Sequence, residues 1–164
     1  MGNNENLQKG DEAELKFKEW LDKHNIPYFY IKQDKETFSA AFKNTSAKRP
    51  DFMVLIPNFG FIFVDVKNRK LHPTFKNYPL DSDETKKFSS LQRTFNAHIW
   101  YVISNEDYDF KTWLWIPVSK VFESGMSKFN SSKSKEEFYA VPPEEFIQIA
   151  DNDSLDRLFT KSFG

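Results

Sequence analysis

The amino-acid sequence of 164 residues contains no cysteine. This absence excludes disulfide frameworks, zinc sites built on thiolates and a cysteine nucleophile, and it favours an intracellular, cytoplasmic protein. No apolar run approaches the roughly 18 residues that a membrane-spanning helix needs, so we expect no membrane contact. The polar N-terminus also lacks the apolar core of a secretory signal peptide. With 39% hydrophobic and 29% charged residues, the sequence predicts a globular domain large enough to bury a core.

The sequence also lacks an excess of charge of either sign, because its formal net charge is −1 at pH 7. A protein that binds nucleic acid without regard to sequence usually carries a basic excess. The charges are unevenly spread, however: residues 136–164 hold seven acids and two bases, whereas the stretch between Glu36 and Asp81 holds seven bases and two acids. Those two acids are Asp51 and Asp65. Carboxylates isolated in a basic segment are expected to have a specific role.

Hydrophobic periodicity predicts one α/β domain over residues 10–164. We expect a disordered polar leader at residues 1–9 and an acidic helical extension from about residue 136 to residue 164. Helices are predicted at residues 10–25 and from Ser82 onward, where Ser82 serves as the N-cap. Strands are predicted at residues 28–31, 52–56, 61–67, 99–103 and 112–116. This order predicts a mixed sheet flanked by helices.

The two isolated acids are expected to meet at one end of a β-hairpin. Side chains alternate across a strand, so Asp65 and Lys67 share one face. A carboxylate within an apolar strand is costly unless it is paired or binds a cation. The antiparallel hairpin formed by residues 52–56 and 61–67 brings Asp51, at the start of one strand, toward Asp65, near the end of the other. Two converging carboxylates form a site of hard oxygen ligands that suits Mg²⁺ or Mn²⁺.

The first predicted helix offers a third carboxylate. At 100° per residue, Glu12 and Glu19 point away from the apolar face, whereas Glu14 lies at its margin and is the better placed to look toward the sheet. The choice between Glu12 and Glu14 stays open at this point. Gly10, one turn earlier, falls on the predicted buried face, where it would permit a close approach of backbones.

These motifs resemble those of a known nuclease family. Pro50-Asp51, followed after thirteen residues by Asp65-Val66-Lys67, resembles the PD-(D/E)xK nuclease signature. Gly10-x-x-x-Glu14 ahead of a helix is similar to the N-terminal motif of the branch that resembles archaeal Holliday junction resolvases. Gln92 resembles a glutamine that some branches carry after the lysine, although Asn96 stands where some of them have an aromatic residue. The resemblance covers about residues 10–104.

The resemblance implies a restriction-endonuclease-like fold with an αβββαβ core, and cleavage of DNA phosphodiester bonds with Mg²⁺ or Mn²⁺. The metal ligands that it implies are Glu14, Asp51, Asp65 and the backbone carbonyl of Val66. It also implies that Lys67 positions or helps to deprotonate the attacking water and balances charge on the phosphate, with Gln92 as a further catalytic residue. Restriction, repair, recombination, mobile-element and phage enzymes share such cores, as endonucleases or exonucleases. Junction resolution would require a homodimer.

The basic residues around the motif are expected to form a rim that contacts DNA phosphates. The candidates are Lys48, Arg49, Arg69, Lys70 and Arg93. A solvated surface explains most of them equally well, just as a turn explains Asp51, an ion pair explains Asp65, and an exposed helix position explains Glu14 and Gln92. The alternative function is a non-catalytic module that retains the nuclease fold and binds nucleic acid or another protein.

Overall fold

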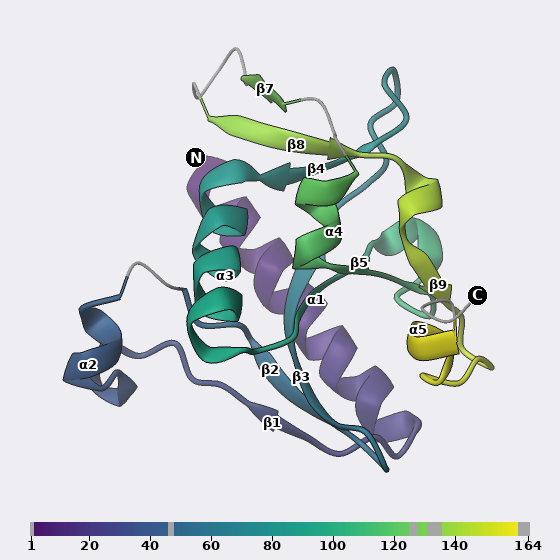
Figure 1. Cartoon of the computed structure of the whole chain (residues 1–164). Helices are drawn as coiled ribbons and strands as arrows, with labels where there is room; N and C mark the ends of the chain where they lie inside the picture. Colours follow the sequence, from purple (N-terminus) through teal and green to yellow (C-terminus); the bar gives the residue numbers. More distant parts are fainter. Residues whose placement is uncertain (1, 46–47, 125–127, 131–135, 161–164) are drawn as a thin grey trace.

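The computed structural model describes residues 2–45, 48–124, 128–130 and 136–160 (Figure 1). A six-stranded sheet has the order β1-β2-β3-β5-β6-β9, and a three-stranded sheet has the order β4-β8-β7. The strands of the larger sheet are β1 (Tyr28–Tyr30), β2 (Phe52–Ile56), β3 (Gly60–Asn68), β5 (Ile99–Ser104), β6 (Trp113–Pro117) and β9 (Ile147–Ile149). Those of the smaller sheet are β4 (Tyr78–Asp81), β7 (Lys128–Asn130) and β8 (Glu137–Val141). The α-helices are α1 (Gly2–Lys23), α2 (Ala40–Lys43), α3 (Ser82–Phe95), α4 (Val118–Glu123) and α5 (Arg157–Thr160).

The larger sheet is mixed, as the sequence predicts. Strands β3 and β5 run parallel, whereas β2 and β3 form the expected antiparallel hairpin, in which Phe52 pairs with Val64 and Ile56 with Gly60. Asn58 and Gly60 in the connecting turn have φ angles of 62° and 127°. Asparagine and glycine tolerate positive φ better than other residues do. The turn chemistry therefore sets the register on which the site depends.

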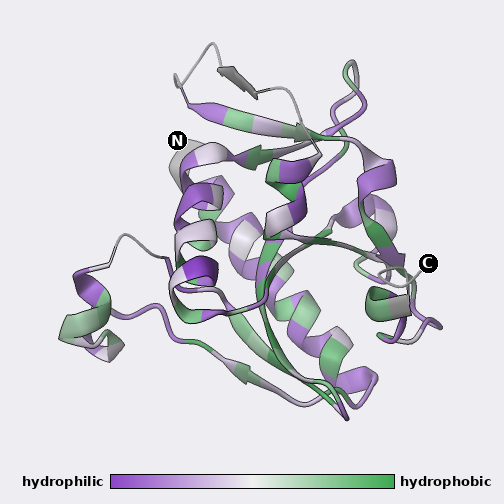
Figure 2. Cartoon of the chain, in the orientation of Figure 1, coloured by the Kyte–Doolittle hydropathy of each residue, from purple (hydrophilic) through white to green (hydrophobic). Residues whose placement is uncertain are grey.

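Two apolar clusters cover the two faces of this sheet. On one face, Phe17 of α1 is fully buried and its ring lies 5.3 Å from that of Phe52 and 4.9 Å from that of Trp113. On the other face, Phe88 of α3 packs against Tyr101 of β5, with ring centroids 5.7 Å apart. Figure 2 shows the apolar residues concentrated along the central strands. Burial of each such aromatic side chain stabilises the fold by about 1.5–3 kcal/mol, so both helices are held firmly against the strands that carry the site.

The expected disordered leader is wrong for residues 2–9, because α1 already begins at Gly2. Residues 4–9 are exposed, so no apolar periodicity marks these turns as helical. Their glutamate, leucine, glutamine and lysine are good helix formers, and no proline interrupts them. The helix therefore extends beyond the residues that the apolar pattern predicts.

The expected helical extension over residues 136–164 is also wrong. Within residues 136–160, β8 pairs with β4 and β9 pairs with β6, where Trp115 lies opposite Ile147. The helical structure there is limited to a 3-10 turn at Pro143–Glu145 and the short α5. Residues 161–164 lie outside the described part of the chain. The acidic composition suggested helix, but pairing with strands distant in the sequence decides the conformation.

In the described part of the chain, no helix is both long enough and apolar enough to cross a membrane.

Candidate functional site

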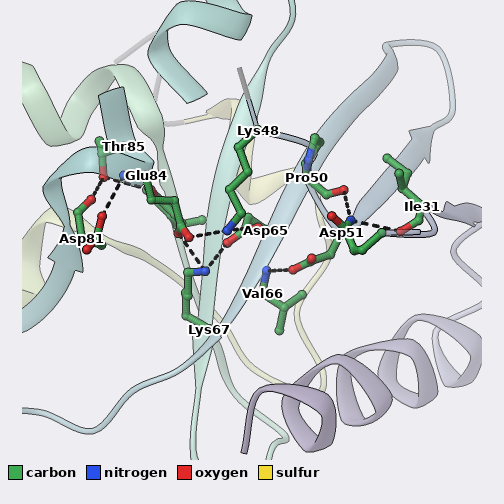
Figure 3. Close-up of polar contacts among 12 residues, drawn as sticks. Ile31, Lys48, Pro50, Asp51, Asp65, Val66, Lys67, Asp81, Glu84 and Thr85 are labelled. Atoms are coloured by element: carbon green, nitrogen blue, oxygen red, sulfur yellow. Dashed lines mark hydrogen bonds and ion pairs between the residues drawn. The ribbon is translucent and has the colours of Figure 1, made fainter. Parts of the chain in front are cut away.

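Asp51 and Asp65 are brought together by the register of the β2–β3 hairpin. Phe52 pairs with Val64, so the preceding residue, Asp51, lies opposite Asp65. The Asp51 backbone N–H donates to the Val64 carbonyl at 3.0 Å, and the Asp51 Oδ2 accepts from the Val66 N–H at 2.8 Å (Figure 3). Both side chains are buried, with Asp65 only 1% exposed. The hairpin thus holds two carboxylates at the same end of two adjacent strands.

Lys67 lies beside Asp65 and is also paired with an acid from α3. The Lys67 Nζ is 2.6 Å from the Asp65 Oδ2 and 2.7 Å from the Glu84 Oε1. The second oxygen of Glu84 binds Lys48, whose Nζ is 4.0 Å from the Asp65 Oδ1. These four residues form an alternating-charge network of two ammonium groups and two carboxylates (Figure 3). Sequence reasoning placed Lys48 on the outer rim and missed Glu84.

Glu84 is held in place by the cap of α3. The N-cap is Asp81 rather than the expected Ser82, and its Oδ1 accepts from the Glu84 backbone N–H at 2.7 Å. Thr85 donates its hydroxyl to the Asp81 carbonyl at 2.6 Å and shares a hydrogen bond of 2.9 Å with the Tyr101 hydroxyl. In the sequence, an acid in the first turn of a helix has an ordinary explanation in the helix dipole. Only the packing of α3 on the sheet brings Glu84 to Lys67.

Glu14, rather than Glu12, reaches the site. Glu14 is half-buried on α1, and its Oε2 accepts from the Tyr30 hydroxyl at 2.8 Å. It lines the same cleft as Asp51 and Asp65, whereas Glu12 is exposed and outside the lining. Gly10 also lines this cleft, but a Cβ added to it would meet nothing within 4 Å. The expected close approach at Gly10 is therefore wrong.

The cleft has a volume of about 540 Å³ and lies at the end of β3. Besides the residues already described, the first turns of α1, the end of β3 and the smaller sheet contribute to its walls. Those residues are Asn6, Lys9, Asn68, Arg69, Asp81, Glu136 and Phe138. Sequence reasoning identified Arg69 among them. The others were missed because their role in the cleft depends on how α1 and β8 pack beside the strand ends.

Burial and neighbouring charges shift the pKa values of the site in opposite directions. Burial, together with Asp65 and Glu14, raises the pKa of Asp51 to about 8, and burial also raises that of Asp65. Burial raises the pKa of Glu84 too, but Lys67 and Lys48 outweigh this effect and lower it to about 2. Burial lowers the pKa of Lys67, yet Asp65 and Glu84 outweigh it and hold this pKa above its ordinary value. At neutral pH, Glu84 and Lys67 are therefore charged, while Asp51 experiences an excess of negative charge.

Replacing Asp51 by asparagine is expected to stabilise the metal-free protein at pH 8 by about 1–2 kcal/mol. The amide oxygen keeps the acceptor for Val66, and the substitution removes repulsion from Asp65 and Glu14. The pKa of Asp51 is raised in the folded state, so its contribution favours folding below pH 4 and is lost as pH rises toward about 8. The advantage of the variant should therefore grow between pH 5 and pH 8, measured by urea unfolding with EDTA.

The exposed helix acid Glu12 supplies a matched control for this stability measurement. Glu12→Gln should leave the difference from wild type nearly independent of pH. An Asp51→Asn variant that is less stable than wild type at pH 8 would contradict the repulsion between the carboxylates.

The donor set suits one divalent cation. When fully ionised, the site has two net negative charges, from the carboxylates of Glu14, Asp51, Asp65 and Glu84 and the ammonium groups of Lys48 and Lys67. Within the described residues, no three His, Cys, Asp or Glu side chains already enclose a metal position. Mg²⁺ is usually bound by only one or two protein carboxylates, with water and substrate phosphate completing its shell. Asp51 and Asp65 meet that smaller requirement.

The structure does not bring Gln92 to these residues. The Gln92 Oε1 accepts from the Ile99 backbone N–H at 3.2 Å, near the C-terminal end of α3. Asn96, four residues on, is the C-cap in the left-handed conformation. Gln92 therefore secures the connection between α3 and β5, because the helix carries it away from the turn that bears Glu84.

The remaining rim candidates differ in how their side chains are held. Arg49 donates to the Asp34 carbonyl at 2.9 Å and lies 3.4 Å from the centre of the Phe38 ring, so it secures the segment before β2. Lys70 is exposed and pairs with acids of residues 106–107 at 3.4 and 3.6 Å. Arg93 is exposed on α3. Of the expected rim, only Lys48 and Arg69 line the cleft.

The chain order of the core matches the predicted αβββαβ pattern, since α1, β1, β2, β3, α3 and β5 follow one another around the site. The core has the restriction-endonuclease-like arrangement. Strand β4 is inserted before α3 and belongs to the smaller sheet. The predicted mixed sheet flanked by helices is thus confirmed.

Comparisons with known proteins give matches among solved structures, all of them nucleases. Hjc, a Holliday junction resolvase from Archaeoglobus fulgidus, is 17% identical with a TM-score of 0.49, over 80% of this chain and 88% of that one. A nuclease from a fusselovirus is 15% identical with a TM-score of 0.44, over 92% and 88%. A bacterial homing endonuclease is 16% identical with a TM-score of 0.43, over 90% and 76%. No family model and no curated protein matches the chain.

Proposed function

We propose that the protein is a nuclease that hydrolyses phosphodiester bonds of DNA with the help of Mg²⁺ or Mn²⁺. The observation that carries this proposal is the placement of Asp51 opposite Asp65, with the Lys67 ammonium 2.6 Å from Asp65, at the wall of one cleft. Carboxylates that face each other suit a hard cation, and an ammonium beside them suits a phosphate. The DNA substrate is part of the proposal, and the homodimer and the cytoplasmic location stay predictions.

The residues that would hold the metal are Asp51 and Asp65, with the backbone carbonyl of Val66 and the Glu14 carboxylate as further oxygen donors. When bound, such an ion lowers the pKa of a water molecule and acts as a Lewis acid toward a phosphoryl oxygen. The hydrogen bond from the Val66 N–H orients Asp51, and the one from the Tyr30 hydroxyl orients Glu14. The chain thus supports two of these carboxylates with donors of its own.

Lys67 supplies positive charge for the phosphate. Its ammonium is largely buried, with the side chain 15% exposed, so its field is screened less than that of a surface lysine. Charge that develops on the non-bridging oxygens would be stabilised by this ammonium without rearrangement of the site. Lys9 and Arg69 at the walls of the cleft are available for neighbouring phosphates of the same strand. These contacts position DNA but do not select a sequence.

The experiment that tests this proposal is an assay of the full chain on supercoiled plasmid, single-stranded DNA and branched DNA. We expect cleavage with Mg²⁺ or Mn²⁺, none with EDTA, and product strands that carry a 5′-phosphate. An RNA strand of the same sequence tests the preference for DNA. A wild-type protein that binds these nucleic acids but cuts none with either metal would overturn the enzyme proposal and favour the non-catalytic module.

A further inference from the structure

The largely buried Lys67 has two carboxylate partners, and only one of them is a candidate metal ligand. Asp65 lies 2.6 Å from the ammonium on the metal side of the site. Glu84 lies 2.7 Å from it on the opposite side and belongs to α3 rather than to the β2–β3 hairpin (Figure 3). A cation on Asp65 would compete with the ammonium for the same oxygens. Lys67 therefore needs a second anchor if both charges are to stay in the cleft.

Glu84 has the position and the rigidity of such an anchor. Its side chain is 17% exposed, its backbone N–H donates to Asp81, and its second oxygen binds Lys48. The cap of α3 and the bridge between two lysines hold the carboxylate at one point. Glu84 does not line the cleft itself, so it acts on the chemistry through Lys67.

We propose that Glu84 is a positioning residue, which holds the Lys67 ammonium at the phosphate position while Asp65 is engaged with the metal ion. This inference rests on the proposed nuclease function. Lys48 holds the second oxygen of Glu84, so the carboxylate stays directed at Lys67 when the pair between Lys67 and Asp65 opens. The network therefore accepts a cation at Asp65 without losing the ammonium from the cleft.

Kinetics provide the first test, on folded variants checked by circular dichroism and thermal unfolding. Glu84→Gln should lower kcat about 10- to 100-fold, with KM for DNA within about threefold of wild type, as expected for lost positioning. The double variant Glu84→Gln/Lys48→Gln removes one charge of each sign and should show the same loss, which excludes net charge as the cause. It also replaces the single variant if an unpaired Lys48 prevents folding. The neighbouring acid Asp83, which pairs with Lys87 at 2.9 Å, gives the control Asp83→Asn, expected within twofold of wild type.

Binding of Mn²⁺ alone provides a second test that does not depend on cleavage. In the Glu84→Gln background, Lys67 pairs with Asp65 and competes directly with the cation. Adding Lys67→Gln should then tighten Mn²⁺ binding at least about fivefold more than the same substitution does in wild type, in a double-mutant cycle measured by calorimetry. The long-range effect of removing one ammonium is common to both backgrounds and cancels.

The outcomes separate this inference from the proposed function. An equal gain in the two backgrounds, or an unchanged kcat in Glu84→Gln, would overturn the role of Glu84. A wild-type protein that binds Mn²⁺ but cuts no DNA would overturn the nuclease proposal, while the binding cycle would still decide whether Glu84 anchors Lys67. A wild-type protein that binds no Mn²⁺ would overturn both.

Discussion

Replacing Asp65 by asparagine is expected to reduce metal-dependent DNA cleavage roughly 1,000-fold. Asp65 is 1% exposed and lies opposite Asp51, so it is the carboxylate that a divalent cation would share with the hairpin. Asparagine keeps the shape and removes the charge, which should also weaken Mn²⁺ binding at least about tenfold. Single-turnover cleavage of end-labelled DNA, with enzyme in excess, measures the chemical step, and calorimetry measures the metal affinity.

Asp107→Asn is the matched control for this substitution. Asp107 is an exposed acid whose partner Lys70 lies 3.6 Å away on the surface, so its loss should leave both measurements within twofold of wild type. Circular dichroism and thermal unfolding establish that Asp65→Asn is folded. Cleavage by this variant within tenfold of the wild-type rate would contradict the assignment of Asp65 as a metal ligand.

Replacing Lys67 by glutamine is expected to lower kcat roughly 100-fold. The reason differs from that for Asp65, because the ammonium stabilises charge on the phosphate and does not hold the metal. Mn²⁺ affinity should therefore stay unchanged or rise up to about twofold, since one competing positive charge is removed. The same single-turnover assay and the same calorimetric titration separate the two effects.

Lys70→Gln is the control for Lys67, because Lys70 is exposed and lies three residues further along the chain. We expect its kcat to remain within about threefold of wild type. Loss of Mn²⁺ binding in Lys67→Gln would refute the division of roles between Asp65 and Lys67, and so would full activity of that variant. Together, the two substitutions test whether one residue serves the metal and the other serves the phosphate.

The hairpin was predictable from the sequence because its signals are local. Alternation along β3 places Asp65 and Lys67 on one face, and the short turn of residues 57–60 sets the antiparallel register that aligns Asp51 with Asp65. The strand elsewhere in the chain was harder to predict. Ile147 and Ile149 look like an irregular acidic segment until β6 offers them a pairing edge. The N-terminal turns of α1 were missed because residues 4–9 bury no apolar face.

The sequence by itself determined the two carboxylates and the lysine of the candidate site, since a period of two residues and one tight turn are enough to bring them together. Tertiary structure decided the partners. It directed Glu14 rather than Glu12 into the cleft, moved Lys48 from the rim to Glu84, and left Gln92 bound to the backbone of Ile99. The physical reason is that ion pairs between elements depend on how helices pack on the sheet, and that packing is decided by buried aromatic side chains far from the charges.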